Sequence, residues 1–159
     1  MNPKFTIIIP CYNAEEYIEK CIMSALDQDY ENCEVIVIDN DSGDDSLEIV
    51  EEIYDKHQNF TLDTVANIYP FSWQEPVEKA LSMFTGDYVT ILGADDYLAK
   101  NYVSNVVNFL SSSEEKIDCF QSSIRCINRS GDEQGGDICN TYDGIDDLKE
   151  KLLEKCVVA

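Results

Sequence analysis

Two neighbouring carboxylates, Asp95 and Asp96, follow a short apolar run at residues 88–92. A run of this kind, rich in β-branched residues, predicts a buried strand. Ligands of open α/β sheets bind beyond the carboxyl ends of the strands. Two acids at that place can hold a divalent cation and, through it, a phosphate. Asp is also a common turn residue, so Asp95 and Asp96 could instead simply end the strand.

Two earlier apolar runs also end in residues that could bind a ligand. Residues 5–9 are followed by Pro-Cys-Tyr-Asn at 10–13, and residues 34–38 by Asp-Asn-Asp-Ser-Gly-Asp-Asp at 39–45. In a parallel sheet, all three strand ends open on the same edge. An aromatic ring there can pack against a base, a carboxylate can accept hydrogen bonds from base or ribose, and a cation can bridge a diphosphate. The combination predicts a site for a nucleoside diphosphate.

The segments that must position these residues are of two alternating kinds, short apolar runs and apolar stripes with helical spacing. Apolar runs predict strands at residues 5–9, 34–38, 60–66, 88–92 and 117–127. Helical stripes predict a helix capped by Asn13, a second helix capped by Asp44, Asp45 or Ser46, and a third with Pro76 as its first residue. They also predict helices at 103–110 and 143–156. Strands that alternate with helices predict an α/β fold with a mostly parallel sheet flanked by helices.

Composition limits the class of partner. The 159 residues suit one domain, and 44% of them are hydrophobic, so we expect a folded core. The 32 acidic residues exceed the 11 basic ones and give a net charge of −21, which argues against nucleic acid or anionic lipid as a partner. This charge would repel a phosphorylated ligand too, and a bound cation would offset that repulsion. Solubility or a salty medium would also explain acids scattered along the chain.

The number and spacing of the cysteines indicate whether the protein belongs to a reducing or an oxidising cellular compartment. There are seven cysteines, an odd number, and none forms a Cys-x-x-Cys pair. We therefore expect reduced thiols in a cytoplasmic protein and no zinc site. No apolar run approaches the length of a membrane-spanning segment.

Taken together, these motifs resemble the inverting, GT-A-fold glycosyltransferases of family 2. The resemblance runs from Thr6 to about Leu98. It is carried in order by four segments, 7–13, 21–30, 35–44 and 85–98, which look like the family's first strand and turn, the next helix and turn, the second strand and turn, and the strand leading into its Asp-x-Asp-type motif.

The resemblance implies a role for each matching residue. Nucleotide-sugar binding falls to Pro10, Tyr12, Asn13, Asp39, Asp41, Ser42, Asp95 and Asp96. Within this set, Pro10 and Tyr12 would line the nucleobase site, usually for uracil, and Asp39 would hydrogen-bond the base. Asp95 would coordinate Mg²⁺ or Mn²⁺ together with the diphosphate oxygens, with Asp96 as a neighbour or water-mediated ligand.

Three features depart from the family pattern. Gly93 stands where the fuller motif has an acid. Since side chains alternate along a strand, residues 95 and 96 should face opposite sides, which predicts a single direct protein ligand and weak metal binding without nucleotide. The arginine often found before the central helix is replaced by residues 69–76, where Trp73 could line the donor pocket or simply pack. No motif identifies the catalytic base among the available acids Asp132, Glu133, Asp137, Asp143, Asp146 and Asp147.

The implied reaction moves a sugar from a nucleotide diphosphate donor, normally a UDP-sugar, to an acceptor hydroxyl with inversion, in polysaccharide, glycolipid or glycoprotein synthesis. A non-catalytic nucleotide-sugar-binding module is the alternative, because no base is identified. A nucleotidyltransferase fits less well, since no Gly-rich loop or Arg/Lys cluster follows the first strand. We expect a single domain at 1–159, with a donor-binding half at 5–98 and a partial acceptor-side half at 99–159. The expected location is the cytoplasm, including the cytoplasmic face of a membrane.

Overall fold

The computed structural model describes residues 2–57, 59–67, 72–113, 117, 122, 124–128, 130 and 132–134. Contacts divide the chain into two compact units, Met1–Glu114 and Glu115–Ala159. Every helix and strand of the described residues belongs to the first unit, and the described part of the second holds an isolated antiparallel bridge between Ile127 and Glu133. Within the same described ranges, no helix has the length and apolar character needed to cross a membrane.

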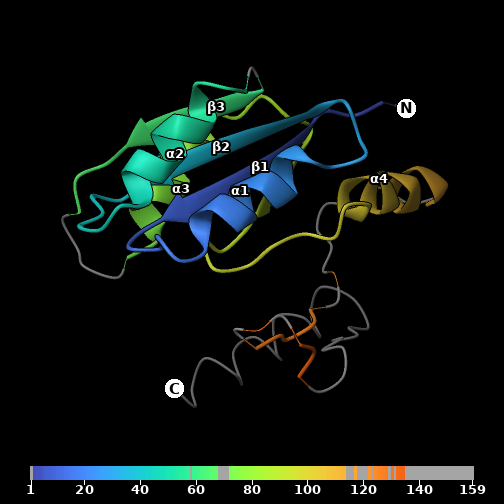
Figure 1. The fold of residues 1–159 in the computed structure, drawn as a ribbon. Helices are drawn as coiled ribbons and strands as arrows, with labels where there is room; N and C mark the ends of the chain where they lie inside the picture. The colour runs from blue at the N-terminus through green and yellow to red at the C-terminus, as the bar shows by residue number, and fades with distance from the viewer. Residues whose placement is uncertain are drawn as a thin grey trace, which may run out of the picture. The chain divides into compact units, whose positions relative to one another are not determined.

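A parallel sheet forms the centre of the first unit (Figure 1). Its strands are β1 (Phe5–Cys11), β2 (Cys33–Asp39), β3 (Phe60–Thr64) and β4 (Tyr88–Ile91), in the order β3-β2-β1-β4. Long runs of Ile and Val favour extended backbone and explain β1 and β2, which are almost completely buried. The register pairs Cys11 with Asp39 and Ile8 with Ile91, so the chain leaves β1, β2 and β4 at the same edge.

Helices cover both faces of this sheet (Figure 1). On one face, α1 (Ile18–Leu26) and α2 (Ser46–Tyr54) contact each other and the strands. On the other, α3 (Gln74–Met83) packs on β1 and β2, where Ala80 joins a core cluster with Ile8, Ile36 and Ile38. The buried residues that alternate with these isoleucines project toward α1 and α2. A loop then connects β4 to α4 (Tyr102–Ser112).

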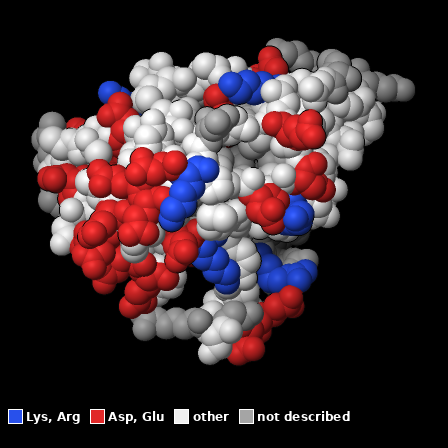
Figure 2. All heavy atoms as spheres, turned by 45° about the horizontal axis from the view of Figure 1, so that its top comes forward, with Lys and Arg blue, Asp and Glu red and all other residues white. Residues whose placement is uncertain are grey.

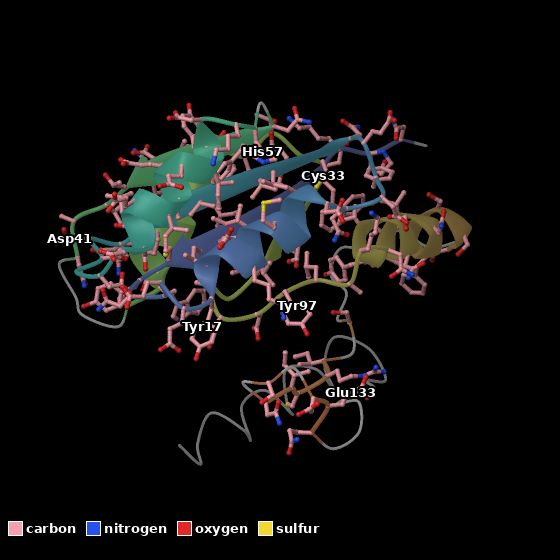
Figure 3. The ribbon with its side chains drawn as sticks, viewed as in Figure 1. Tyr17, Cys33, Asp41, His57, Tyr97 and Glu133 are labelled. Atoms are coloured by element: carbon pink, nitrogen blue, oxygen red, sulfur yellow. The ribbon has the colours of Figure 1, made fainter. Side chains whose placement is uncertain are left out.

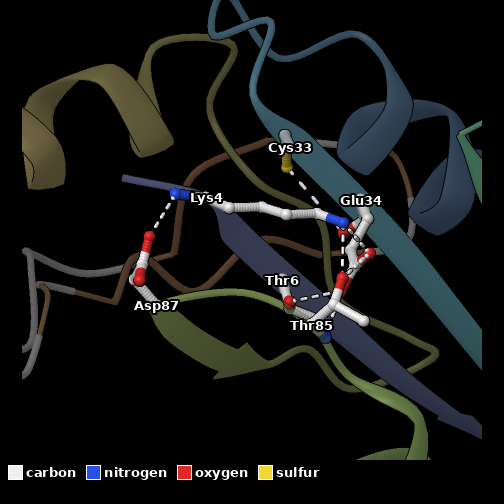
Figure 4. A network of polar contacts seen from close by, with 6 residues as sticks. All are labelled: Lys4, Thr6, Cys33, Glu34, Thr85 and Asp87. Carbon is white, nitrogen blue, oxygen red and sulfur yellow. Dashed lines mark hydrogen bonds and ion pairs between the residues drawn. The ribbon is translucent and has the colours of Figure 1, made fainter. Parts of the chain in front are cut away.

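A polar network lies at the opposite edge of the sheet, where the strands begin (Figure 4). The Glu34 carboxylate of β2 accepts hydrogen bonds from the Thr6 hydroxyl at 2.8 Å and from both the backbone N–H and the hydroxyl of Thr85, each at 2.8 Å. Lys4 forms an ion pair with the same carboxylate. The network therefore joins β1, β2 and the segment that enters β4.

The predicted α/β fold with a mostly parallel sheet is confirmed, and each predicted element within the described residues of the first unit is present. The predicted cap of the first helix is wrong: α1 begins at Ile18, and Asn13 instead has a backbone φ of 47°. Pro76 is the third residue of α3 rather than its first. The predicted strand at 117–127 lies mostly outside the described residues, and the predicted helix at 143–156 lies entirely outside them.

Candidate functional site

The loops after β1 and β2 are joined by hydrogen bonds at the carboxyl edge of the sheet. The Asn13 side-chain oxygen accepts the Gly43 N–H at 2.7 Å, and the Asn13 N–H donates to the Ser42 hydroxyl at 3.1 Å. Two further hydrogen bonds join the same loops. The Asp45 backbone N–H donates to the Glu15 carboxylate at 3.0 Å, and the Glu15 backbone N–H donates to the Asp44 carboxylate at 3.1 Å. Asn13 therefore acts as a bridge between loops rather than as a helix cap.

Asp39 is a buried carboxylate held in a fixed orientation. It is 1% exposed, and both the N–H and the hydroxyl of Ser42 donate to it, at 3.0 and 2.6 Å. Buried acids are stable only when such partners compensate for lost hydration. Ser42 is therefore the residue that orients Asp39, and through Asn13 it ties this acid to the loop after β1.

Asn13 and Asp41 have left-handed backbone conformations, with φ of 47° and 58°. Asn and Asp tolerate this region better than other non-glycine residues, because their short side chains can hydrogen-bond locally. Figure 3 shows Asp41 at the outer end of its loop, where it is exposed. At the end of β1, Pro10 and Tyr12 are both half-buried.

Asp95 and Asp96 converge over Gly93. A turn follows β4, in which the Asp96 N–H donates to the Gly93 carbonyl at 3.0 Å. A Cβ placed on Gly93 would lie 3.1 Å from an oxygen of Asp95 and 3.1 Å from an oxygen of Asp96. The two oxygens are therefore within twice that distance of each other. The prediction that these side chains face opposite sides is wrong, because β4 ends at Ile91 and strand alternation does not apply in the turn.

The electrostatics of this pair suit a cation. Burial, followed by the neighbouring Asp95 carboxylate, raises the pKa of Asp96. A positive ion would remove the repulsion between the two acids, and carboxylate oxygens are ligands that Mg²⁺ and Mn²⁺ prefer. No group of three or more His, Cys, Asp or Glu residues that could hold a metal occurs among the described residues. The pair therefore fits a cation whose other ligands are water and phosphate.

Two buried thiols lie beside the site without chemistry of their own. Cys11 ends β1, and burial, followed by the Asp39 charge, raises its pKa to about 12. Burial also raises the pKa of Cys21, whose thiol donates to the Gly93 carbonyl at 3.3 Å. Both thiols stay protonated at neutral pH, so they pack as small apolar groups rather than act as nucleophiles.

Asn40 is a buried residue of the site to which the sequence analysis gave no role. It is 3% exposed, and its N–H donates to the Cys11 carbonyl at 2.8 Å. Its side-chain amide donates to the Ser72 carbonyl at 3.1 Å, which ties the end of β2 to the segment before α3. Its position directly after Asp39 is the feature of the sequence that could have identified it as a residue of the site. Trp73, in that same segment, is 64% exposed and so does not serve as a core residue.

The candidate bases belong either to residues that the structure does not describe or to the second compact unit. Asp137, Asp143, Asp146 and Asp147 lie beyond the described residues. Glu133 pairs with Arg125 at 2.6 Å, and Asp132 accepts a hydrogen bond from the Asn128 side chain at 3.2 Å. Both belong to the second compact unit.

Comparison with known families identifies the chain's relatives. The family model described as glycosyl transferase family 2 matches residues 6–156. The chain belongs to this family. The match extends well past Leu98, where the four motifs end, and it confirms the resemblance that they indicated.

Individual proteins are similar to this chain in sequence, and two of them, whose structures are solved, are similar in fold as well. An uncharacterized glycosyltransferase of Haemophilus influenzae is 40% identical over 110 residues, which cover 68% of this chain and 42% of that protein. S. aureus TarS 1–349, solved in complex with UDP-GlcNAc, is 32% identical with a TM-score of 0.61 over 68% of this chain and 31% of that one. A mannosyltransferase from Pyrobaculum calidifontis, solved with GDP-Man and Mn²⁺, is 29% identical with a TM-score of 0.62 over 70% of this chain and 33% of that one.

These similarities establish the GT-A fold of this family 2 chain. They also show that the chain spans less than half the length of each of these relatives.

Proposed function

We propose that this family 2 chain binds a nucleotide-sugar, normally a UDP-sugar, and takes part in inverting transfer of the sugar to an acceptor hydroxyl. The observation that carries this proposal is the meeting of three loops at one sheet edge, where Asp39 is oriented by Ser42 and where Asp95 and Asp96 converge. The similarity to S. aureus TarS 1–349, solved in complex with UDP-GlcNAc, supports a UDP-sugar as the donor. The acceptor belongs to polysaccharide, glycolipid or glycoprotein synthesis.

In this proposal each loop binds a different part of the donor. Pro10 and Tyr12 contact the base, and the fixed Asp39 carboxylate accepts a hydrogen bond from a base N–H. Asp41, Ser42 and Asn13 shape the loop around the ribose. Asp95 and Asp96 hold Mg²⁺ or Mn²⁺, which when bound offsets the negative charge of the diphosphate. The two carboxylates thereby keep the diphosphate in a protein whose net charge of −21 would otherwise repel it.

The proposal divides the chain by role: residues 5–98 form the donor-binding half and residues 99–159 part of the acceptor-binding half of one GT-A domain. It locates the protein in the cytoplasm or at the cytoplasmic face of a membrane. The described cysteines support a reducing compartment, since all four, Cys11, Cys21, Cys33 and Cys126, are free thiols.

Thermal unfolding with UDP and Mn²⁺ tests donor binding. Ligand at about 100 times its dissociation constant stabilises a protein by about 2.7 kcal/mol. For a chain of this size we expect a rise in melting temperature of roughly 5–10 °C. Asp95→Asn should abolish the rise, because it removes a charge without changing shape. Asp55→Asn, an exposed acid at the end of α2, is the matched control and should leave it intact.

A second measurement separates an enzyme from a binding module. If UDP and Mn²⁺ stabilise the chain, hydrolysis of UDP-sugars that is lost in Asp95→Asn shows turnover at this site. Stabilisation without turnover would favour the non-catalytic nucleotide-sugar-binding module. No shift with any nucleoside diphosphate would defeat both readings.

A further inference from the structure

The loop that carries Asp95 and Asp96 lies along α1 and is attached to it through side chains. The Ser24 hydroxyl of α1 accepts the Leu98 N–H at 3.0 Å, and the Lys20 ammonium lies 3.9 Å from the centre of the Tyr97 ring. Figure 3 shows Tyr97 next to α1. Together with the contact from Cys21 to the Gly93 carbonyl, these interactions hold the loop on both sides of the two acids.

Gln28, two residues beyond α1, makes the most connections. Its amide NH₂ donates to the Ser24 carbonyl at 2.9 Å and to the Ala99 carbonyl at 2.9 Å. Its amide oxygen accepts the Val103 N–H at 2.9 Å. Val103 lies in the first turn of α4, where backbone N–H groups lack partners within the helix. One side chain thus joins the end of α1, the loop and the start of α4.

The two carboxylates depend on this external support. Among the described residues, no side-chain hydrogen bond is formed to Asp95 or Asp96. Mutual repulsion between the two carboxylates tends to push the turn open. The backbone that carries the two acids is held on either side of them, at Gly93 by Cys21 and at Leu98 by Ser24.

We propose that Gln28 is a positioning residue for the Asp95–Asp96 pair, with Ser24 as its partner: by fixing the loop between α1 and α4 they keep both carboxylates directed at one point. The inference rests on the proposed function, because the point in question is the cation site of the donor complex. It predicts that loosening this brace weakens cation binding although neither residue touches the cation.

Three variants of the full chain test the role of the brace. Gln28→Met keeps the length and approximate volume of the side chain and removes all three hydrogen bonds. Ser24→Ala removes one contact to the loop. Ser82→Ala is the matched control, because Ser82 donates to the Lys79 carbonyl of α3 at 2.6 Å just as Ser24 donates to the Cys21 carbonyl of α1 at 2.7 Å, but it has no contact with the loop.

Two readouts distinguish positioning from general stability. In the protein without metal or nucleotide, hydrogen exchange at residues 94–99 should speed up in Gln28→Met and less so in Ser24→Ala, while exchange in β1 and β2 stays unchanged. With UDP present, the dissociation constant for Mn²⁺, measured from the spin resonance of free Mn²⁺, should rise about tenfold in Gln28→Met, the low end for residues that support metal ligands. Ser82→Ala should change neither quantity.

The outcomes separate this inference from the proposed function. If hydrogen exchange at residues 94–99 is unchanged in both Gln28→Met and Ser24→Ala, the positioning role is overturned, whatever the dissociation constant for Mn²⁺. Faster exchange with an unchanged Mn²⁺ constant would also overturn it, since the loop would then not control the acids. If the unmodified chain binds neither UDP nor Mn²⁺, the proposed function fails, and with it the link from brace to cation, while the exchange data still report whether Gln28 orders the loop.

Discussion

At Gly93 the missing side chain lets two carboxylate oxygens approach the backbone closely. From the sequence, this residue marks a lost acidic ligand of the family motif. In the structure, a Cβ there would be 3.1 Å from both Asp95 and Asp96, which is tight even for a methyl group. The glycine thus permits a turn in which Asp95 and Asp96 face one point, so under the proposed function the cation site differs in arrangement from the family motif and does not simply lack one ligand.

We expect Gly93→Ala to weaken cation binding with little loss of stability. The methyl group would push apart two side-chain ends that are free to rotate toward solvent, so the melting temperature without ligand should change little. The stabilisation by UDP with Mn²⁺ should fall, because the acids would no longer converge. Thermal unfolding with and without both ligands measures the two effects, and UDP alone is the control. An unchanged shift with UDP and Mn²⁺ would show that convergence of the pair is unimportant.

Among the elements, β1 organises the molecule at both ends. At its carboxyl end it delivers Pro10 and Tyr12 to the candidate site, and at its start it meets β2 and the entry to β4 around Glu34 (Figure 4). Glycine at position 86 is required there, because a Cβ would lie 2.9 Å from the Tyr88 carbonyl and 3.0 Å from the Lys4 carbonyl. The register that aligns the three site loops is thus secured at the far edge of the sheet.

The Glu34 network predicts a pH-dependent contribution to stability. Burial alone would raise the pKa of Glu34, but hydrogen bonds from Lys4, Thr85 and Thr6 outweigh it and lower the pKa from 4.5 to about 2. A pKa that is lower in the folded state gives stability that is fully present above pH 4.5 and is lost as pH falls toward 2. Glu34→Gln should therefore lower the unfolding free energy by about 1–3 kcal/mol at neutral pH.

Urea unfolding of both forms at neutral pH and at about pH 3 checks this contribution. The difference between the parent chain and Glu34→Gln should shrink at the lower pH, because Glu34 of the unfolded chain, with a pKa of 4.5, is protonated there while Glu34 of the folded chain is still ionised. Glu78→Gln, an exposed acid on α3, is the control and should show a much smaller effect. An equal difference at both pH values would show that the carboxylate charge does not matter.

At the scale of the whole molecule, negative charge greatly exceeds positive charge. The net charge is −21, and Figure 2 shows acidic side chains crowded over one part of the visible surface with few basic ones among them. Exposed acids also belong to the loops at the carboxyl edge of the sheet, Glu15, Glu16, Asp41 and Asp45 among them. This field opposes the compact state and any diphosphate that arrives without a cation.

Salt should therefore stabilise the folded chain. The Debye length falls from about 30 Å at 0.01 M to about 3 Å at 1 M ionic strength, so repulsion between separated acids is almost abolished. We expect the melting temperature without ligand to rise over this range of NaCl. A fall in melting temperature would show that screened ion pairs, such as Lys79–Asp63 at 2.9 Å, outweigh the repulsion.

The sequence by itself determined the order of elements, the parallel sheet and the edge at which the site lies. The physical reason is that burial on both faces of β1 and β2 favours long apolar runs, and a polar residue within them needs a partner, as Thr6 finds in Glu34. The residues at the strand ends also match motifs of the family. For this reason Asp39, Asp95 and Asp96 could be chosen as candidate site residues from the sequence alone. Their binding roles stay predictions.

Only the tertiary structure decided how these residues are held. Asn13 reaches across to Gly43 instead of capping α1, Asp95 and Asp96 converge in a turn instead of alternating along a strand, and Gln28 ties their loop to two helices. The first and the last depend on hydrogen bonds between residues 30 and 75 positions apart, whereas the second depends on a turn that strand periodicity does not describe. Local propensity and periodicity describe a chain's neighbours in sequence, so they cannot specify which distant hydrogen-bond partner a loop residue meets once the sheet has formed.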